Sequence, residues 1–420
     1  MTNIGEEVFD LIKKELDRQN AGIELIASEN YCSRTVREAC GSILTFKYAE
    51  GYPQKRYYGG CEYIDKIEQL AIDNACKLFN CKYANVQPHS GSQANAAAYR
   101  ALEKYLKITD RKMKILTMNL NDGAHLSHGS SVSFSSNLYE FNFFDLGDDG
   151  KLDFGIIEKA INEYKPDVLL SGYSAYPYAI DFSKFKELAD KYNCVFMVDM
   201  AHIAGLVAAG YHQNPCDYAD IVTTTTHKTL RGPRGGLILT NNEDIYKKVN
   251  SAVFPYYQGG PLENIIAGKA ICFEEAMTCE FKNYIKCVIE NTQAFTNRCI
   301  QRGISCSKTD NHLMLINTKK SFGITGLDAQ IALEEIGITT NKNMIHNDTE
   351  TPKTTSGLRI GFAAITTRGC NTSTAVLIAD IICDYLSGSI NALDAKYRVN
   401  LVVSSLKDCR DGCISVYNIV

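Results

Sequence analysis

Short apolar segments alternate with longer helical patterns through the first two thirds of this 420-residue chain. The segments are YANVQ (83–87), KILTM (114–118), DVLLSGY (167–173), CVFMVDM (194–200), DIVTTTT (220–226) and GGLILT (235–240). Apolar strands separated by helices are typical of a mostly parallel sheet with helices on both faces. The sequence therefore predicts an α/β fold, in which ligands bind beyond the carboxyl ends of the strands.

A second region follows the predicted sheet. Between Pro261 and about Arg302 apolar residues recur at helical spacing, and no Gly or Pro follows Gly268, which predicts a long helical connector. A smaller α/β unit is predicted beyond it from HLMLINT (312–318), DAQIALEEIG (328–337) and GLRIGFA (357–363). We expect an N-terminal arm over 1–30, a large domain over 31–280 and a small C-terminal domain over 281–420.

The composition excludes several classes of protein. Hydrophobic residues make up 45% and charged residues 22% of the chain, as in globular proteins with a large core. A net charge of −4 without runs of like charge argues against nucleic-acid or membrane partners. The weakly polar segment 202–211 is shorter than the about 20 residues that a membrane helix needs. The N-terminal residues resemble neither a signal peptide nor a transit peptide, which predicts a cytoplasmic protein.

Sixteen cysteines are scattered along the chain. None forms a CxxC pair or a Cys/His cluster with the spacing of a zinc site, and the closest pair is Cys409 and Cys413. We therefore predict no metal site, and expect reduced thiols that are mostly buried as small hydrophobic residues.

Lys228 lies among small hydroxyl residues and glycines in TTTTHKTLRGPRGG (223–236). An amine in such a segment suits Schiff-base formation with an aldehyde. Asp199, near the end of the segment 194–200, is a lone acid whose carboxylate could keep a pyridine nitrogen protonated. Taken singly, Lys228 could be a solvated loop lysine and Asp199 a helix N-cap. Taken together, they predict a site for pyridoxal phosphate.

The segment PHSGSQANAAAYRALEKYL (88–106) begins with Ser-Gly-Ser and continues as an alanine-rich helical pattern. We expect Ser92 to be the N-cap, and the free N–H groups at a helix start favour a phosphate. Gly91 would let the backbone approach a ligand closely, and the Ser90 and Ser92 hydroxyls would add donors. Serine caps are common without a ligand, so this prediction needs a basic neighbour, for which His227 is the candidate.

Three further features of the sequence each allow two interpretations, a ligand site or a structural role. His125 in DGAHLSHG (122–129) could lay its imidazole on a pyridine ring or lie in a surface loop. Arg359, between small residues in SGLRIG (356–361), suits bidentate capture of an amino-acid carboxylate or an internal ion pair. The segment 47–71 crowds a glutamate, tyrosines, an arginine and glycines together, as in a catalytic loop or a surface hairpin.

Taken in order, these motifs resemble the serine hydroxymethyltransferase (glycine hydroxymethyltransferase) family over nearly the whole chain. The matching segments are ELIASEN, KYAEGYP, KRYYGGCEY, NVQPHSGSQAN, VDMAHIAGLVAAG, TTTTHKTLRGPRGG, AVFPYYQGGP and TSGLRIG. The resemblance implies a fold-type I pyridoxal phosphate enzyme with a mostly parallel mixed sheet in its large domain. Its reaction would be the reversible transfer of the hydroxymethyl carbon of L-serine to tetrahydrofolate, giving glycine and 5,10-methylenetetrahydrofolate.

The resemblance also implies a role for each matched residue. Lys228 would carry the cofactor as an aldimine, with Asp199 at the pyridinium nitrogen and His125 stacked on the ring. Further cofactor contacts would come from Ser90, Gly91, Ser92, Ser174, His202, His227, Tyr48, Gly259 and Gly260. The substrate would contact Ser28, Glu50, Tyr58, His202 and Arg359, with the carboxylate held by Arg359. Catalysis would involve Lys228, Glu50, Tyr58, His125 and His227, with Glu50 as the general acid-base group.

Each site would be shared between subunits, because the family builds it at a dimer interface. The residues that would come from the neighbouring subunit are Tyr48, Glu50, Tyr58, Gly259 and Gly260. The resemblance therefore implies an obligate homodimer or a tetramer. The folate would lie along Leu120, Ala124, Leu126 and Asn343, with further contacts at 351–353.

Two departures from the family pattern lie near the substrate and folate. Gly361-Phe362-Ala363-Ala364 stands where the family has Gly-Thr-Pro-Ala, and Gly123-Ala124-His125 stands where it has Gly-Gly-His. They leave two alternatives open: a folate-independent threonine aldolase, and a catalytically weak paralogue that regulates an active subunit. The folate-dependent transferase is preferred because the residues for proton transfer and cofactor attachment are present.

Overall fold

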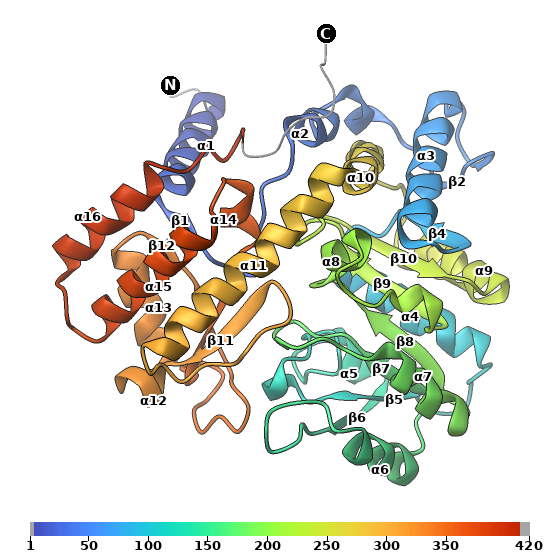
Figure 1. Ribbon diagram of the computed structural model, residues 1–420. Helices are drawn as coiled ribbons and strands as arrows, with labels where there is room; N and C mark the ends of the chain where they lie inside the picture. The colour runs from blue at the N-terminus through green and yellow to red at the C-terminus, as the bar shows by residue number, and fades with distance from the viewer. Residues whose placement is uncertain (1–3, 412–420) are drawn as a thin grey trace. The chain divides into compact units, whose positions relative to one another are not determined.

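The computed structural model describes residues 4–411, which divide into two compact units. The larger unit comprises residues 32–285, and the smaller unit joins the residues up to Tyr31 to those from Lys286 onward. Each unit has a β-sheet with helices packed on it (Figure 1). The N-terminal helix of the predicted arm, α1 (Ile4–Ala21), thus belongs to the same unit as the C-terminal helices.

The larger unit is built on a seven-stranded mixed sheet. Its strands are β4 (Tyr83–Asn85), β5 (Lys114–Met118), β6 (Glu140–Phe144), β7 (Val168–Ser171), β8 (Val195–Asp199), β9 (Ile221–Thr225) and β10 (Gly236–Thr240). The spatial order is β4-β10-β9-β8-β7-β5-β6, and β10 alone runs antiparallel to its neighbours. The predicted mostly parallel α/β sheet is confirmed. The sequence did not reveal β6, an edge strand in which Phe144 is the one buried residue.

Helices cover both faces of this sheet, and the alternation of side chains along β8 shows which helix lies on which face. Val195 and Met197 belong to a buried cluster with residues of α4 (Gly91–Tyr105) and α9 (Glu243–Ser251). Phe196 instead stacks on Phe185 of α7 (Phe182–Lys191), with ring centroids 5.8 Å apart. Since successive strand residues point to opposite faces, α4 and α7 lie on opposite sides of the sheet.

The remaining elements of the larger unit connect these strands or cover their edges. They are α2 (Arg34–Cys40), η1 (Ile43–Phe46), the hairpin of β2 (Gly51–Tyr52) and β3 (Lys55–Arg56), α3 (Glu62–Phe79), η2 (Leu120–Asp122), α5 (Phe134–Leu138), α6 (Phe154–Tyr164), α8 (Ala204–Ala209), η3 (Pro215–Asp217), η4 (Ala252–Tyr257) and α10 (Glu263–Ala276). The helix α11 (Cys279–Gln301) spans the boundary between the two units.

The long helical connector predicted from 261 to 302 is two helices, α10 and α11. The break lies at Met277 and Thr278, where the Thr278 hydroxyl accepts a hydrogen bond from the Phe281 N–H at 3.2 Å. A threonine cap can start a new helix without any Gly or Pro. The spacing of apolar residues therefore gave no sign of the break.

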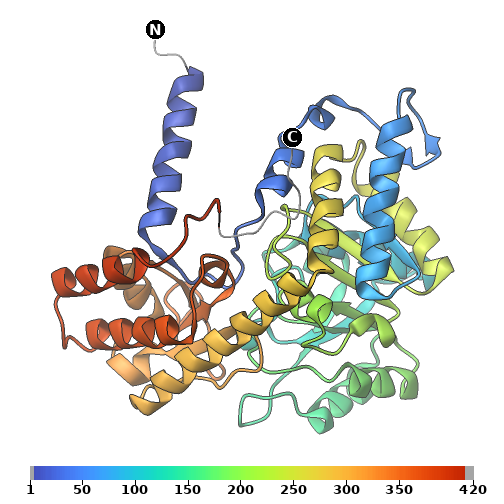
Figure 2. The ribbon, with the colours of Figure 1, turned by 45° about the horizontal axis from the view of Figure 1, so that its top comes forward.

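The smaller unit contains a three-stranded antiparallel sheet in the order β11 (Leu313–Asn317), β14 (Gly357–Gly361) and β13 (Asn341–Asn343). Two short strands, β1 (Ile23–Glu24) and β12 (Ile338–Thr339), pair in parallel. The helices are α12 (Thr318–Phe322), α13 (Gly326–Glu335), α14 (Ala363–Thr367), α15 (Thr372–Leu386) and α16 (Ala392–Val403). Figure 2 shows α1 projecting from this unit.

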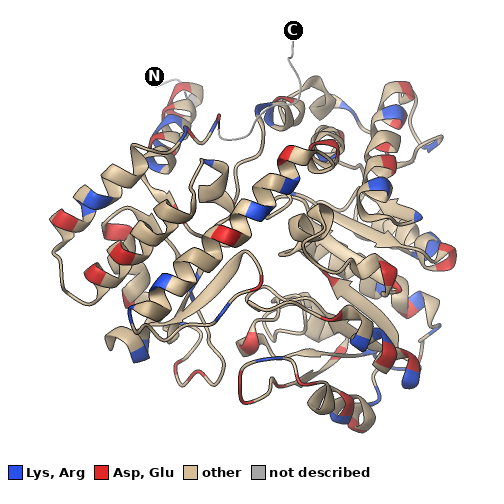
Figure 3. Ribbon diagram, viewed as in Figure 1, with Lys and Arg blue, Asp and Glu red and all other residues tan. Residues whose placement is uncertain are grey.

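The distribution of surface charges, the hydropathy of the helices and the burial of the thiols can be checked on the described residues. Acidic and basic residues are interspersed along the helices of both units (Figure 3). No helix within residues 4–411 combines the length and apolarity needed to cross a membrane. Cys409 is a buried free thiol, and Cys413 lies outside the described residues.

Candidate active site

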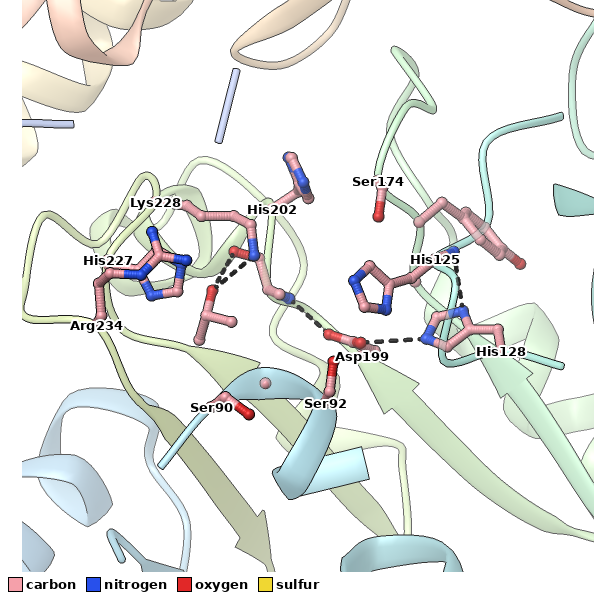
Figure 4. A pocket seen from close by; sticks show the side chains of 15 residues that line it. Ser90, Ser92, His125, His128, Ser174, Asp199, His202, His227, Lys228 and Arg234 are labelled. Carbon is pink, nitrogen blue, oxygen red and sulfur yellow. Dashed lines mark hydrogen bonds and ion pairs between the residues drawn. The ribbon is translucent and has the colours of Figure 1, made fainter. Parts of the chain in front are cut away.

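One pocket of the larger unit lies at the carboxyl ends of the parallel strands. Asp199 is the last residue of β8, Lys228 follows the end of β9, and Ser90 lies between β4 and α4. The cavity has a volume of about 150 Å³ and is lined by Ser90, Gly91, Ser92, His125, His128, Gly172, Tyr173, Ser174, Asp199, Ala201, His202, Thr225, His227, Lys228 and Arg234 (Figure 4). The fold thus brings the amine, carboxylate, helix start and histidines predicted from four separate segments into one pocket.

Lys228 presents its amine to this pocket from a closed loop. The Thr226 N–H donates to the Gly235 carbonyl at 3.2 Å, and the Gly232 N–H donates to the Thr226 carbonyl at 2.7 Å, so the loop after β9 folds back on itself. Lys228 is buried, and its Nζ donates to the Thr225 hydroxyl at 3.1 Å. The Thr225 hydroxyl therefore holds the amine at the pocket wall, where desolvation by burial would favour a nucleophilic lysine.

Asp199 is a buried carboxylate with several donors around it. Its Oδ2 accepts from Asn95 Nδ2 at 2.8 Å and from His128 Nε2 at 3.1 Å, while its Oδ1 accepts from the Ala201 N–H at 3.0 Å. Burial would raise the pKa of Asp199, but the hydrogen bonds from His128 and Asn95 outweigh burial and hold that pKa below its usual range. Asp199 is therefore ionised at neutral pH.

His128 was not predicted as a site residue, although it holds Asp199 in place. Its Nδ1 accepts the backbone N–H of His125 at 3.4 Å, so its Nε2 carries the proton that is donated to Asp199. The one signal in the sequence is the spacing of the two histidines in DGAHLSHG. The side-chain atoms of His125, His128 and Asp199 that could bind a metal ion lie within 4.8 Å of one another. The hydrogen bonds described above account for this short separation.

His125 lies in the pocket wall beside this network. Its Nδ1 shares a hydrogen bond of 2.7 Å with the Ser127 hydroxyl, and that hydroxyl also accepts from Asn95 Nδ2 at 2.8 Å. The ring of His125 is therefore oriented by the same asparagine that holds Asp199. Figure 4 shows His125, Asp199 and Lys228 around one common space.

The start of α4 corrects the predicted helix cap. Ser90 is the N-cap, because its hydroxyl accepts from the Gln93 N–H at 3.2 Å, whereas Ser92 lies in the first turn of the helix. The predicted role of Ser92 as the cap was therefore wrong. A Cβ at Gly91 would lie 2.5 Å from Cγ2 of Thr225, so a larger residue would push this loop away from the lysine loop.

The loop after β7 reaches the pocket because Gly172 passes close to β8. Gly172 has a φ of +102°, and a Cβ there would lie 1.9 Å from the Asp199 carbonyl oxygen. The loop is also fixed to the His125 loop, since the N–H groups of Ser174 and Ala175 donate to the Gly123 carbonyl at 2.7 and 3.1 Å. Ser174 is thereby positioned on the rim of the pocket.

Two further histidines line the pocket. Burial lowers the pKa of His227 to about 3, and the neighbouring Lys228 charge adds to the effect, so its imidazole is neutral. The buried Nδ1 of His227 has no hydrogen-bond partner among the described residues. His202 is buried, and its carbonyl accepts from the Thr229 hydroxyl at 2.9 Å.

A second cluster in the larger unit contains the residues expected to serve a neighbouring subunit. The rings of Tyr48 and Tyr58 pack edge to face with centroids 5.2 Å apart. A Cβ at Gly259 would lie 2.8 Å from Oε1 of Glu50, and one at Gly260 would lie 3.3 Å from the Tyr48 ring. These five residues do not line the pocket that holds Lys228.

The predicted substrate residue Arg359 lies on β14 of the smaller unit. Its Nε donates to Oδ1 of Asn341 at 3.3 Å, and burial lowers its pKa to about 10, which leaves the guanidinium charged at neutral pH. Ser28, also predicted for the substrate, belongs to the same unit. Phe362, which departs from the family pattern, is fully buried and packs on Phe295 with ring centroids 5.2 Å apart. This departure therefore fills the core of the smaller unit.

The residues predicted for the folate lie in both units. Leu120 begins η2, Ala124 is buried, and Leu126 is 53% exposed in the loop that leads to His128. Asn343 lies on β13 of the smaller unit, where its side chain donates to the Met344 carbonyl at 2.6 Å. Residues 351–353 are exposed in a loop of the same unit.

The donor set of the Lys228 pocket fits pyridoxal phosphate. A buried amine can bind the aldehyde, and an ionised buried carboxylate can hold a proton on the pyridine nitrogen. The N-terminus of α4 offers free N–H groups and hydroxyls to a phosphate. The buried Nδ1 of His227 would gain a partner from a polar ligand.

Comparisons with known proteins agree with this geometry. The sequence model of the serine hydroxymethyltransferase family matches residues 1–382. A serine hydroxymethyltransferase of Mesoplasma florum is 52% identical over 389 residues, which cover 92% of this chain and 93% of that protein. One of Mycoplasma capricolum is 54% identical over 371 residues, or 88% of each chain. Serine hydroxymethyltransferase 2 of Pseudomonas putida is 53% identical over 384 residues, which cover 91% of this chain and 90% of that protein.

Proposed function

The chain belongs to the serine hydroxymethyltransferase family, and we propose that its Lys228 pocket binds pyridoxal phosphate for the reaction of that family. The reaction is the reversible transfer of the hydroxymethyl carbon of serine to tetrahydrofolate, which gives glycine and 5,10-methylenetetrahydrofolate. Relatives with this name match about nine tenths of the chain, and they favour the transferase over the threonine aldolase and the weak paralogue. The observation that carries the proposal for the site is the pairing of buried Lys228 with ionised Asp199 in one pocket.

In this proposal the larger unit holds the cofactor. When bound, pyridoxal phosphate supplies an electron sink for the electrons left on the amino-acid Cα as the hydroxymethyl group departs. Lys228 binds the aldehyde carbon, and Asp199 holds the proton on the pyridine nitrogen. The start of α4, with Ser90, Gly91 and Ser92, binds the phosphate. His125 covers the ring, Ser174 and His202 lie toward its phenolic oxygen, and His227 supports the lysine.

Arg359 binds the substrate carboxylate in this proposal, with Ser28 as a second contact. Its guanidinium is charged at neutral pH, its Nε donates to the Asn341 amide oxygen at 3.3 Å, and its planar fork suits bidentate binding of a carboxylate. Glu50 moves the proton at the serine hydroxyl and at the folate nitrogen. The folate lies along Leu120, Ala124, Leu126 and Asn343, with 351–353 as further contacts.

We further propose that the chain acts as a homodimer, or a tetramer of such dimers, in the cytoplasm. Glu50, Tyr48, Tyr58, Gly259 and Gly260 then serve the site of the neighbouring subunit. Large apolar side chains near this cluster support an interface, since Ile43, Phe46, Tyr57 and Tyr63 are between 70% and 83% exposed. Such a patch is typical of a surface that another chain covers.

The direct test is to mix the purified protein with pyridoxal phosphate, serine labelled on the hydroxymethyl carbon, and tetrahydrofolate. We expect glycine and labelled 5,10-methylenetetrahydrofolate in equal amounts by mass spectrometry, and neither product without the folate. A protein that makes no glycine from serine but cleaves allo-threonine would be the aldolase instead. A protein that does neither as a homo-oligomer would be the weak paralogue.

Replacing Arg359 with lysine should raise KM for serine by about 10- to 150-fold, because a charge-assisted hydrogen bond is worth roughly 1.5–3 kcal/mol. The expected effect on kcat is smaller, since the carboxylate is bound in both the ground state and the transition state. Steady-state kinetics with serine measures both constants. The matched control is Arg398→Lys, at a partly exposed arginine paired with Asp384, which should leave KM within about twofold of the original value. An unchanged KM in Arg359→Lys would remove this arginine from the substrate site.

A further inference from the structure

Three glutamines form a hydrogen-bonded chain through the interior of the larger unit. Gln93 Nε2 donates to Oε1 of Gln258 at 2.9 Å, and Gln258 Nε2 donates to Oε1 of Gln87 at 3.4 Å. Gln87 and Gln258 are buried. Buried amides of this kind fix one another, because a side chain that rotates away leaves its partner unsatisfied.

One end of the chain holds the loop proposed to bind the phosphate. The Gln93 N–H donates to the Ser90 hydroxyl at 3.2 Å, and Oε1 of Gln93 accepts from the His89 N–H at 2.5 Å. Gln93 therefore closes the helix start on both sides, in the manner of a capping box. Gln93 thus contacts Ser90 through its backbone N–H and the preceding residue, His89, through its side chain.

The other end of the chain holds the hairpin that carries Glu50. Gln87 Nε2 donates to the Gly51 carbonyl at 2.9 Å and to Oε1 of Glu68 at 2.7 Å. Arg56 completes this support, because its guanidinium binds Oε2 of Glu68 at 2.6 Å and the carbonyls of Ala49 and Gly51 at 2.9 and 3.1 Å. The carbonyls of the residues before and after Glu50, Ala49 and Gly51, are thus held by the buried network.

The middle of the chain reaches Glu50 by a second route. Gln258 directly precedes Gly259 and Gly260, which lie against the side chains of Glu50 and Tyr48. A shift of the Gln258 backbone would therefore move the surface on which the Glu50 carboxylate rests. The Gln258 N–H is itself fixed to the Val253 carbonyl at 3.0 Å.

We propose that Gln87, Gln93 and Gln258 are positioning residues that couple phosphate binding at the start of α4 to the position of Glu50. The inference rests on the proposed function, which assigns the cofactor phosphate to Ser90–Ser92 and the acid-base role to Glu50. In the proposed homodimer Glu50 serves the neighbouring site. Filling one site would then set the acid-base group of the other.

The test is hydrogen exchange measured by mass spectrometry on peptides covering 49–57, with and without pyridoxal phosphate. The unsubstituted protein should show slower exchange in this hairpin when the cofactor binds, because the Tyr57 N–H donates to the Glu50 carbonyl at 3.0 Å and reports on hairpin order. Gln258→Met keeps the side-chain length and removes both hydrogen bonds of the Gln258 side-chain amide, to Gln93 and to Gln87. We expect it to bind the cofactor, seen by its visible absorbance, and to lose most of the cofactor-dependent slowing.

Kinetics separate positioning from simple destabilisation. In Gln258→Met we expect kcat to fall about tenfold and KM for serine to stay within about twofold, since Glu50 acts in proton transfer. Gln87→Met should show the same changes in kcat and KM. It provides a second test of the coupling if Gln258→Met does not fold. The matched control is Gln69→Met, an exposed position on α3 where the amide donates to Asp73, which should keep both the slowing and kcat.

The outcomes distinguish the inference from the function on which it rests. If the unsubstituted protein binds no cofactor, the proposed function fails and the coupling fails with it. The coupling alone is overturned if the cofactor binds but does not slow hydrogen exchange in the hairpin. It is also overturned if the cofactor slows this exchange in Gln258→Met and Gln87→Met as much as in the unsubstituted protein. Loss of the slowing in both variants, with intact cofactor binding and a selective fall in kcat, supports it.

Discussion

Lys228→Ala should abolish covalent attachment of pyridoxal phosphate and lower serine turnover by at least about 1,000-fold, as expected when an enzyme loses its covalent catalytic group. The amine is buried in the pocket, where its Nζ donates to the Thr225 hydroxyl at 3.1 Å. Alanine leaves no group within the pocket wall that can bind the aldehyde in its place. Borohydride reduction of the loaded protein, followed by peptide mass spectrometry, measures the attachment.

A matched control for this experiment is Lys159→Ala on α6, where the lysine side chain is 78% exposed. This variant should retain the label on the Lys228 peptide and its full turnover. The assignment of Lys228 would be wrong if Lys228→Ala were labelled to the same extent as the unsubstituted protein. Thermal unfolding of both variants checks that each is folded.

The central strands of the larger unit were predictable because their environment leaves a clear pattern. β8 is buried at each of its five positions, so its residues form a continuous apolar run that ends in Asp199. The edge strand β6 lacks this burial and was missed. The break between α10 and α11 was missed because Thr278 caps a helix as readily as a Gly or Pro would stop one.

The cap of α4 shows where local sequence was ambiguous. Ser90 and Ser92 are both followed at the third position by an amide side chain, Gln93 and Asn95. The longer Gln93 reaches back to the His89 N–H, while Asn95 is drawn inward to Asp199 at 2.8 Å. Tertiary contacts of Asn95 therefore decide which serine caps the helix, and the sequence alone could not show them.

Residues whose role depends on distant partners were the hardest to predict. His128 lies 71 positions from Asp199 in sequence, and only the fold brings them within 3.1 Å. Lys269 on α10 is fully buried, with its Nζ bound to the carbonyls of Val86, Pro88 and Gly236 at 2.6, 3.0 and 2.8 Å. Burial lowers the pKa of Lys269 to about 7. A lysine on a helix gives no sign of such a site in the sequence.

The residues assigned to a neighbouring subunit came from the family resemblance alone. Tyr48, Glu50 and Tyr58 lie in a segment that the sequence could equally assign to a surface hairpin. Their proposed use depends on a second chain, whose contacts leave no periodic pattern in the residues that make them. Exposed apolar neighbours such as Phe46 became informative once their exposure was known.

Asp199→Asn should retain covalent attachment at Lys228 but lower kcat by at least about 100-fold, because a neutral amide cannot keep the pyridine nitrogen protonated. The control is Asp190→Asn, whose side chain is 62% exposed at the end of α7, and it should leave kcat within about twofold. Steady-state kinetics and the borohydride label separate the two effects. A kcat within about threefold of the original in Asp199→Asn would remove Asp199 from its proposed role.

The pH dependence of stability gives an independent check on Asp199. Burial opposes its ionisation, but His128 and Asn95 hold its pKa below the usual value of about 3.9 for an aspartate in an unfolded chain. A lowered pKa in the folded state means that the ionised carboxylate stabilises the fold above about pH 4, and that this stabilisation is lost as the pH falls through the folded-state pKa. The loss of unfolding free energy in Asp199→Asn should therefore be largest at neutral pH and shrink below about pH 4. Denaturant unfolding at pH 7 and at acidic pH measures it, and a difference that grows on acidification would contradict an ionised Asp199.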